Sequence, residues 1–454
     1  MELVRNKTEL PTKFDLRVSA KLDEHSFKYA SVPGDKSISQ RAIMMNAIAE
    51  GKGVIHNVLR SRDIESCIAI LRQLGVTFAW NGNALTVYGL GLQSLRIPDA
   101  RLEIGNTATS ARLIMSVLAG HPFAVELAGN RLLSTRPMDW VAQPLIEMGA
   151  SITYLESEGY LPLVINGRFP LSPINIEATV ASAQEKSAFL FAGLYADGTS
   201  SYRQMCQSRD HTERLMKYFG IDIEIQNNVT SIRGGYNFAA KDVIVPGDLS
   251  SAAFLLAAFT IRSMDRKKEL WIRDVGVNPT RFGFVSVLRE MGVDLKLHRE
   301  RQLISGEPIA DLYCTTGKTL TPVHVEGNEK VQSLIDEVPL LAVVSAFAEG
   351  TTVIRNCREL KDKDTNRLET TAKLLAAFGL ETSYNEDELI IFGGRSPSPA
   401  VVDSYGDHRI AMTAAVLASS MEKPSIIRNC GCIAVSYPEF LNDLSQFAEI
   451  EILQ

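Results

Sequence analysis

Several Lys and Arg residues stand in short polar turns that come directly before apolar runs. The first such turn holds Lys36 and Arg41, the second holds Arg112, and the last holds Arg409. A helix N-terminus has free N–H groups and the positive end of the helix dipole, so it favours acidic side chains rather than cations. A bound phosphate or carboxylate would explain these cations better than stability does. Together they predict an anion site, although each residue taken alone fits a solvated surface charge.

The chain also offers groups for proton transfer near further cations in loops. These cations are Arg136, Lys363 and Arg367, and the acid/base candidates are Asp336, Glu337, Asp364, Asp407 and His408. Two carboxylates in a cation-rich site can take separate roles as acid and base when their surroundings differ. Asp336 and Asp407 also stand where helix N-caps stand, and His408 fits a capping turn as well as a ligand contact.

Several familiar catalytic patterns are absent from the sequence. The histidines show no metal-binding spacing, and Cys430 and Cys432 do not form a zinc pair. There is no P-loop, no G-x-G-x-x-G after a first strand and no G-x-S-x-G turn. We therefore expect no metal and no cofactor, and a small, multiply anionic substrate.

An internal repeat organises the elements that must position these residues. The segments AIAEGKGVIHN (47–57) and AFAEGTTVIRN (346–356) agree at seven of eleven positions. Six polar turns precede apolar helical runs: PGDKSISQ, GNTATSAR, SAQEKSA, PGDLSSAA, DEVPLLAV and GDHRIAM. Five helical runs stop at Gly75, Gly149, Gly220, Gly292 and Gly379, and a strand follows each. The pattern predicts an α/β protein with parallel pairings, built from six units that divide into two lobes of three.

The composition is that of an ordinary globular protein. The chain has 454 residues, 45% of them hydrophobic, and a formal net charge of −6. That charge gives no overall attraction to nucleic acid or to anionic membranes, so an anion site must be local. The six cysteines form no disulfide or metal framework, and neither a signal peptide nor a long apolar segment is seen. We expect a cytoplasmic protein that binds neither nucleic acid nor membrane.

The ordered motifs resemble those of the 5-enolpyruvylshikimate-3-phosphate (EPSP) synthase family, whose members are also called 3-phosphoshikimate 1-carboxyvinyltransferases. The similarity runs from about Val32 to Phe440 and includes the six turns above, STRPM, SRDHTER and the loop KDTNR. It implies a two-lobed inside-out α/β barrel of six βαβαββ units, three in each lobe. Residues 1–32 and 247–454 would form lobe one, residues 33–246 lobe two, and the active site would lie in the cleft between them.

The resemblance also implies the reaction. Enolpyruvyl transfer from phosphoenolpyruvate to the 5-hydroxyl of shikimate 3-phosphate would release phosphate through a tetrahedral intermediate, in the shikimate pathway to chorismate and aromatic amino acids. No cofactor would be needed, and the enzyme would be a monomer.

Site residues follow from the resemblance, position by position. The catalytic set is Asp336, Asp364 and Lys36. Contacts to shikimate 3-phosphate are Lys36, Ser37, Arg41, Ser182, Ala183, Gln184, Ser208, Asp336 and Lys363. Contacts to phosphoenolpyruvate are Lys36, Ala108, Arg136, Gln184, Arg367 and Arg409.

The sequence departs from the family pattern at informative places. The loop usually reads K-E-[ST]-D-R, so Asp364 is one carbon shorter than the usual acid and Asn366 replaces an acid. Ala108 stands where many members have glycine beside phosphoenolpyruvate. We expect its methyl group to make the enzyme insensitive to the longer inhibitor glyphosate.

Three alternatives stay open. The related transferase that acts on UDP-N-acetylglucosamine has a reactive Cys in a loop that here reads GNRLLSTRP, without Cys. An enolpyruvyl transferase acting on another hydroxylated ring acid is a second possibility, because of the changes in KDTNR. A third is a relative that binds the substrates without turnover.

Overall fold

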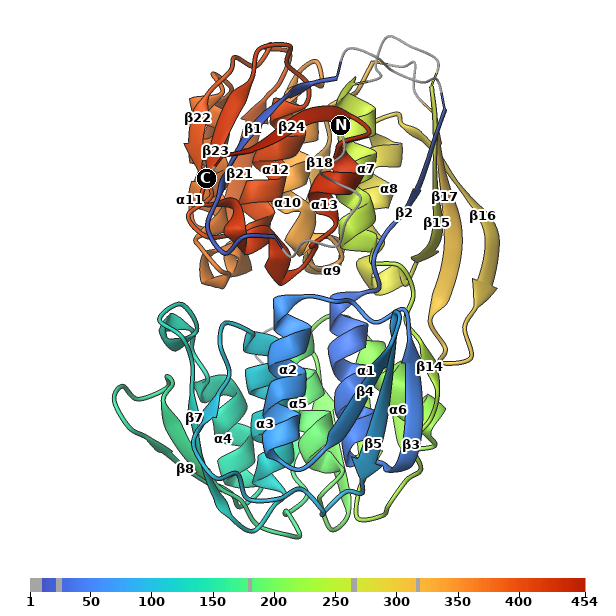
Figure 1. Ribbon diagram of the computed structural model, residues 1–454, viewed down its shortest axis with the longest axis vertical. Helices are drawn as coiled ribbons and strands as arrows, with labels where there is room; N and C mark the ends of the chain where they lie inside the picture. Colours follow the sequence, from blue (N-terminus) through green and yellow to red (C-terminus); the bar gives the residue numbers. More distant parts are fainter. Residues whose placement is uncertain (1–9, 22–26, 179–181, 263–267, 316–318, 454) are drawn as a thin grey trace. The chain divides into compact units, whose positions relative to one another are not determined.

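The computed structural model describes residues 10–21, 27–178, 182–262, 268–315 and 319–453, which fold as two compact units (Figure 1). Unit 1 comprises Met1–Pro33, Pro246–Arg301 and Pro308–Gln454. Unit 2 comprises Gly34–Val245 together with Gln302–Glu307. Six residues in a turn between two strands of unit 1 thus pack with unit 2, a detail that the sequence pattern does not reveal.

Six four-stranded sheets are found in the described part of the chain, three in each unit. In unit 2 their orders are β14 (Val243–Ile244), β3 (Glu50–His56), β5 (Ala84–Leu90), β4 (Thr77–Asn81); β6 (Leu102–Glu103), β7 (Ala124–Ala128), β9 (Leu163–Asn166), β8 (Ser151–Tyr154); and β10 (Asn175–Glu177), β11 (Thr199–Arg203), β13 (Val229–Arg233), β12 (Ile223–Gln226). In unit 1 they are β16 (Asp294–Gln302), β17 (Pro308–Thr315), β15 (Glu269–Gly276), β2 (Phe27–Ser31); β18 (His324–Val325), β19 (Thr351–Arg355), β21 (Glu388–Phe392), β20 (Glu381–Tyr384); and β22 (Val401–Asp403), β23 (Ser425–Arg428), β1 (Asp15–Ala20), β24 (Ala448–Leu453). The predicted α/β class with six repeated units is confirmed.

The pairing within the sheets differs from the expectation of parallel strands. In the sheet of β19, the short strand β18 pairs in parallel with β19, whereas β21 pairs antiparallel with both β19 and β20. The same order recurs around β3, β7 and β11. A helix-containing crossover joins β18 to β19, β6 to β7 and β10 to β11, whereas β14 follows all the other strands of unit 2 and pairs with β3, the first of them. The strands after the second helix of each repeat form a hairpin, which is necessarily antiparallel.

Buried helices form the centre of each unit. Unit 2 contains α1 (Lys36–Ile48), α2 (Arg62–Gln73), α3 (Ala108–Ala119), α4 (Asp139–Glu147), α5 (Ala183–Gly193), α6 (His211–Phe219) and the 3-10 turn η1 (Leu133–Thr135). Unit 1 contains α7 (Leu249–Arg262), α8 (Gly283–Glu290), α9 (Asn328–Gln332), α10 (Val338–Ala346), α11 (Arg367–Ala377), α12 (His408–Ala418), α13 (Phe440–Leu444) and the 3-10 turns η2 (Pro279–Arg281), η3 (Ile335–Glu337), η4 (Arg358–Asp362) and η5 (Cys430–Val435).

The six helices that follow the polar turns are the buried ones: α1, α3 and α5 in unit 2, and α7, α10 and α12 in unit 1. Every residue of α10 is buried, as expected for a helix that is apolar all round. In unit 2, α3 packs against α1 and α5, and in unit 1 the helices α7, α10 and α12 pack against one another. Helices therefore fill the core of each unit and sheets cover it, which is the inside-out arrangement (Figure 1).

The predicted helix stops are confirmed. All five glycines have positive φ, for example 103° at Gly149 and 95° at Gly292, a conformation that other residues rarely adopt. The repeat is visible at strand ends too, because Asn57, Asn356 and Asn429 have φ of 57°, 58° and 61° after β3, β19 and β23. Asn tolerates this left-handed conformation better than most residues do.

Candidate active site

The N-termini of the buried helices gather at one end of unit 2. Asp35 caps α1, Thr107 caps α3 and Ser182 caps α5, each accepting a backbone N–H with its side chain. Gln40 of α1 donates to Thr107 Oγ1 at 2.8 Å, which links the first two N-termini. Arg112 of α3 donates to the Gln184 side-chain oxygen, which links the second and third. The prediction that these turns cap helices is confirmed, and the hydrogen bonds between them show that the three helix N-termini lie close together, while the anion site stays a prediction.

Arg41 links three helices of unit 2 through the hydrogen bonds of its guanidinium group. Its Nε donates to Thr212 Oγ1 at 2.7 Å, its Nη2 to Ser187 Oγ at 2.8 Å, and its Nη1 to the Ser37 carbonyl at 3.1 Å. The side chain is buried, with 4% exposure. Arg41 therefore fixes α1 against α5 and α6.

Lys36 begins α1 and is oriented by an acid on the neighbouring helix. Its Nζ lies 3.1 Å from Asp63 Oδ2, and the Lys36 side chain keeps 26% exposure. Arg112 has a supporting role, because its guanidinium lies 4.2 Å over the Trp140 ring and donates to the Pro137 carbonyl at 3.1 Å. It braces both Gln184 and the loop that holds Arg136.

Four of the remaining sequence-predicted contacts in unit 2 begin helices or lie in loops. Ser182 and Ala183 form the cap and the first residue of α5, and both are half-buried. Ala108 is the first residue of α3 and is buried. Ser208 is buried in the loop before α6, where both its N–H and its hydroxyl donate to Gln204 Oε1.

In unit 1, Arg367 lies at the centre of an acidic cluster. Its Nε donates to Asp407 Oδ2 at 2.8 Å, and its terminal nitrogens lie 3.4 Å from oxygens of Asp336 and Asp364. Burial alone would raise the pKa of Asp407, but the charges of Arg367 and His408 hold it well below its ordinary value. Burial would likewise lower the pKa of Arg367, and Asp407 raises it instead.

The two capping alternatives are now resolved. Asp407 is the N-cap of α12 and accepts from Arg409 N at 2.9 Å. Asp336 is not a cap, because Glu337 occupies the N-cap position of α10. The Asp336 carboxylate faces Arg367 and Arg409 instead. It is therefore available for chemistry.

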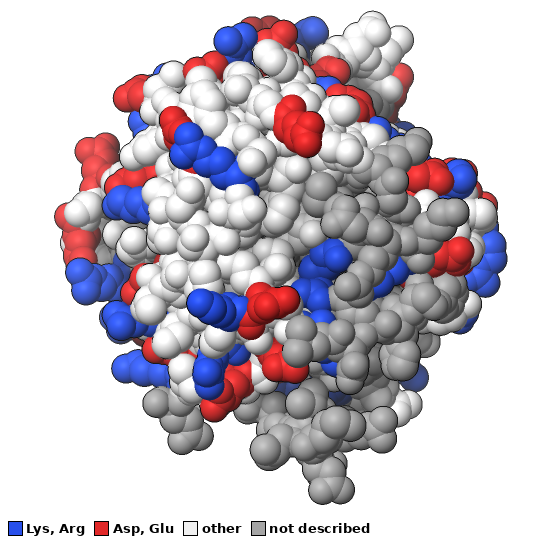
Figure 2. Space-filling view, turned by 90° about the horizontal axis from the view of Figure 1, so that it is seen from above, with Lys and Arg blue, Asp and Glu red and all other residues white. Residues whose placement is uncertain are grey.

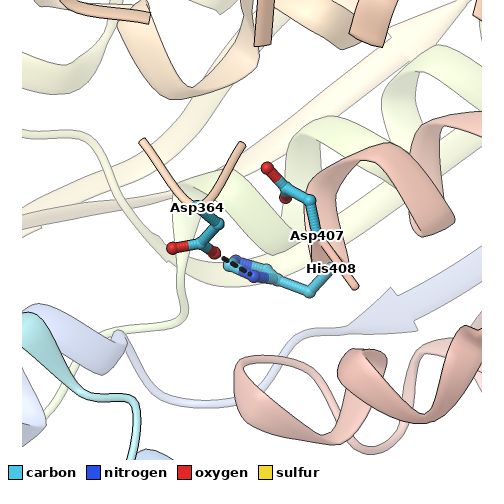
Figure 3. Close-up of side chains that lie close together, drawn as sticks. All are labelled: Asp364, Asp407 and His408. Carbon is cyan, nitrogen blue, oxygen red and sulfur yellow. Dashed lines mark ion pairs between the residues drawn. The ribbon is translucent and has the colours of Figure 1, made fainter. Parts of the chain in front are cut away.

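His408 contacts the candidate acid directly. Its Nδ1 lies 3.0 Å from Asp364 Oδ2, and Asp407 completes the group (Figure 3). The ligand atoms of these three residues lie within 4.8 Å of one another, close enough to consider a metal ion. The Arg367 guanidinium touches both carboxylates, however, and a cation in that place opposes a dication. We keep the prediction that no metal takes part.

Arg409 is braced by residues that sequence reasoning did not single out. Its Nη1 donates to the Asp336 carbonyl at 3.0 Å and to Glu337 Oε1 at 3.2 Å, and its Nη2 to Ser250 Oγ at 3.3 Å. Ser250 also bonds Glu337 and accepts from Arg281, a buried residue of η2. The sequence signals were weak: Ser250 lies in a capping turn, and Arg281 follows a loop proline.

Lys363 pairs with Glu359 four residues before it. Burial alone would raise the pKa of Glu359, but Lys363 lowers it. Unit 1 thus brings together Asp336, Asp364, Arg367 and Arg409, and unit 2 gathers the turns that hold Lys36, Arg41, Ala108 and Gln184.

Charge on the surface is mixed. On the face shown in Figure 2, Lys and Arg lie among Asp and Glu, and neither sign covers a broad area of the described residues. Among those residues no helix is long and apolar enough to cross a membrane. The face in Figure 2 thus offers no broad charged area to which an anion site could be assigned.

The anion-favouring helix N-termini of unit 2 and the paired carboxylates of unit 1 are both typical of an enzyme that acts on small anionic substrates. The profile of the family described as EPSP synthase (3-phosphoshikimate 1-carboxyvinyltransferase) matches residues 28–444. The chain belongs to this family, and it is a transferase of the shikimate pathway.

Close relatives support the assignment. A 3-phosphoshikimate 1-carboxyvinyltransferase from Desulforamulus reducens is 42% identical over 417 residues, covering 92% of this chain and 96% of the relative. One from Bacillus licheniformis is 43% identical over 420 residues, covering 92% and 96%.

Solved structures show the same fold. EPSP synthase from Acinetobacter baumannii has a TM-score of 0.85 and 34% identity, covering 97% of this chain and all of that chain. The enolpyruvyl transferase NikO from Streptomyces tendae has a TM-score of 0.76 at 19% identity, a likeness of fold alone.

Proposed function

We propose that side chains of both units contact the two substrates of the family's reaction, enolpyruvyl transfer from phosphoenolpyruvate to the 5-hydroxyl of shikimate 3-phosphate. Arg367 and Arg409 of unit 1, with Arg136 and Lys36 of unit 2, hold phosphoenolpyruvate. Planar guanidinium groups suit its carboxylate and phosphate because they donate two parallel hydrogen bonds.

The turns of unit 2 hold shikimate 3-phosphate. Ser182, Ala183 and Gln184 supply hydrogen bonds at the N-terminus of α5, where backbone N–H groups favour an anion. Ser37 and Ser208 add hydroxyl groups. The buried Arg41 contributes mainly by fixing these turns, because its hydrogen bonds go to Ser37, Ser187 and Thr212.

Proton transfer is divided between two acids of unit 1. Asp336 removes the proton of the 5-hydroxyl, whose oxygen attacks C2 of phosphoenolpyruvate, and Asp364 gives a proton to the methylene carbon. The tetrahedral intermediate then loses phosphate and one methyl proton, restoring the double bond. Lys36 and Lys363 stabilise the negative charges that these steps move.

The cluster around Arg367 carries this proposal, because Arg367 lies within 3.4 Å of both Asp336 and Asp364. The contact between Asp364 and His408 Nδ1 holds the shorter acid in one orientation. An imidazole beside the acid can return the proton that Asp364 gives up.

The subsite for phosphoenolpyruvate also carries the proposed insensitivity to glyphosate. Ala108 begins α3, directly after the cap Thr107. Its methyl group takes space that glycine leaves open, and glyphosate is longer than phosphoenolpyruvate. We further propose a cytoplasmic monomer, in keeping with six free cysteines.

Phosphate release by purified protein given both substrates tests the assignment. Asp336→Ala and the isosteric Asp336→Asn should each lower the rate by at least about a hundredfold, as expected when a general base is lost. UDP-N-acetylglucosamine in place of shikimate 3-phosphate should give no release. Binding of shikimate 3-phosphate without phosphate release would instead indicate another acceptor or a protein that binds without turnover.

A further inference from the structure

A buried ion pair joins α5 to α6 in unit 2. Lys186 Nζ lies 2.6 Å from Glu213 Oε1, and the two side chains are 1% and 2% exposed. Removing both charges from water is costly, and an apolar pair of similar volume often serves folding equally well or better. The cation therefore calls for an explanation other than stability.

The other contacts of Lys186 lead to a loop. Its ammonium group donates to Gln204 Oε1 at 3.3 Å and to the Ser208 carbonyl at 3.4 Å. With Glu213 as the third acceptor, all three donors of the ammonium group are used. Lys186 thus holds both ends of the segment 204–208.

Gln204, which Lys186 holds in place, in turn holds Ser208. The same Gln204 Oε1 accepts from Ser208 N at 3.2 Å and from Ser208 Oγ at 3.0 Å. A hydroxyl hydrogen rotates freely, so Ser208 can turn it toward a phosphate oxygen while its N–H stays bonded to Gln204.

The adjacent positions of both helices reinforce the arrangement. Ser187, the next residue of α5, lies 2.7 Å from Thr212, the residue before Glu213. Arg41 of α1 donates to both of these hydroxyl groups. The start of α6, and with it the loop before α6, is therefore fixed against α5, whose N-cap is Ser182.

We propose that Lys186, neutralised by Glu213, is a positioning residue that holds the Ser208 loop in the conformation that binds the phosphate group of shikimate 3-phosphate. This inference rests on the proposed contact between Ser208 and that substrate. Lys186 itself is too deeply buried to touch the ligand.

The first variant is Lys186→Met, which keeps the length of the side chain and removes the cation. The Michaelis constant for shikimate 3-phosphate should rise about tenfold or more, since a misplacement of about 1 Å can cost on the order of a hundredfold. The Michaelis constant for phosphoenolpyruvate and kcat, both at saturating shikimate 3-phosphate, should change much less.

Two further variants separate positioning from stability. Lys186→Met combined with Glu213→Leu removes the whole pair, so thermal stability should recover while the Michaelis constant for shikimate 3-phosphate stays raised. Gln204→Leu leaves the ion pair intact and should raise the same constant. Leu190→Ala, a fully buried residue of α5, is the matched destabilising control and should leave that constant unchanged.

The results distinguish the positioning role of Lys186 from the proposed contact between Ser208 and the substrate. An unchanged Michaelis constant in the double variant, or an equal rise in Leu190→Ala, would overturn the positioning role. Calorimetry with shikimate 3-phosphate alone on Ser208→Ala tests the underlying contact. Unchanged binding there means that the proposed contact is wrong, whereas weaker binding there with normal Lys186→Met means that only the positioning inference is wrong.

Discussion

The buried ion pair between Arg367 and Asp407 allows a sharp test of the unit 1 cluster. Asp407 is fully buried, accepts two bonds from Arg367 at 2.8 and 3.2 Å, and caps α12. The substitution Asp407→Asn removes the charge and keeps the shape. Because Asn is as good an N-cap as Asp, the capping contribution is retained.

The expected cost follows from the buried cation that is left behind. Breaking a buried pair by removing one partner costs about 3–5 kcal/mol. For a unit of this size, 1 kcal/mol lowers the melting temperature by about 2–4 °C. Asp407→Asn should therefore melt roughly 6–20 °C below the parent protein, and phosphoenolpyruvate should bind more weakly because Arg367 loses its orientation.

The pH dependence of stability gives a second, independent test of this ion pair. The pKa of Asp407 is lower in the folded state than its ordinary value of 3.8, so its stabilisation is complete above that value and declines as the pH falls below it. Urea unfolding should show a difference between parent and variant that is constant from pH 8 to about 5 and shrinks in more acidic buffers.

A surface pair in the same unit is the matched control. Arg17 and Glu451 lie 3.2 Å apart on β1 and β24, with side chains 53% and 58% exposed. Such pairs contribute about 0–1 kcal/mol, so Glu451→Gln should be nearly neutral. If Asp407→Asn lowers the free energy of unfolding by no more than Glu451→Gln does, the pair of Arg367 and Asp407 does not stabilise the fold as a buried ion pair should.

Three other predictions concern single positions. Burial raises the pKa of the Glu185 carboxyl from 4.5 to about 7, so the folded state favours its neutral form. This contribution to the free energy of unfolding is complete below pH 4.5 and is lost as the pH rises through 7. Glu185→Gln should reduce the fall in unfolding free energy across that range by up to about 3 kcal/mol, measured by urea titrations. Arg281→Gln should raise the Michaelis constant for phosphoenolpyruvate about tenfold, with little change for shikimate 3-phosphate, because Ser250 and Arg409 lose their brace; equal effects on both substrates would argue against it. Ala108→Gly should raise sensitivity to glyphosate in inhibition assays competitive with phosphoenolpyruvate, and potent inhibition of the parent protein would contradict the proposal.

Local chemistry was enough to predict the six helices that follow the polar turns and the five that stop at glycine, but not the short helices α9 and α13. Capping residues such as Thr107 and Asp407, and stops such as Gly149, act over one helical turn, so the sequence displays them. The partners of the strands were harder to predict from the sequence. β14 and β18 have two residues each, too few to show a period, and β1 pairs with β24 from the far end of the chain.

The candidate site was predictable in composition but not in the role of each cation. Arg41 and Lys186 both lie in apolar helical runs, and only the packed structure shows that their charged groups bind side chains of neighbouring helices. Ser250 and Arg281 gave no signal, because a capping serine and a loop arginine are common in any protein. Side chains that support other side chains depend on long-range contacts, which a single sequence does not display.

The two units carry different charged groups in the residues that we propose to meet the substrates. In the unit 1 cluster, Arg367 faces Asp336, Asp364 and Asp407, and Arg409 also faces Asp336. The carboxylates of this cluster are suited to moving protons, and its guanidinium groups are suited to holding an anion beside them. In unit 2, Lys36 begins α1 and Arg112 lies near the start of α3, where backbone N–H groups favour an anion. We therefore expect unit 1 to supply the proton transfer of the proposed reaction and unit 2 to supply much of its anion binding.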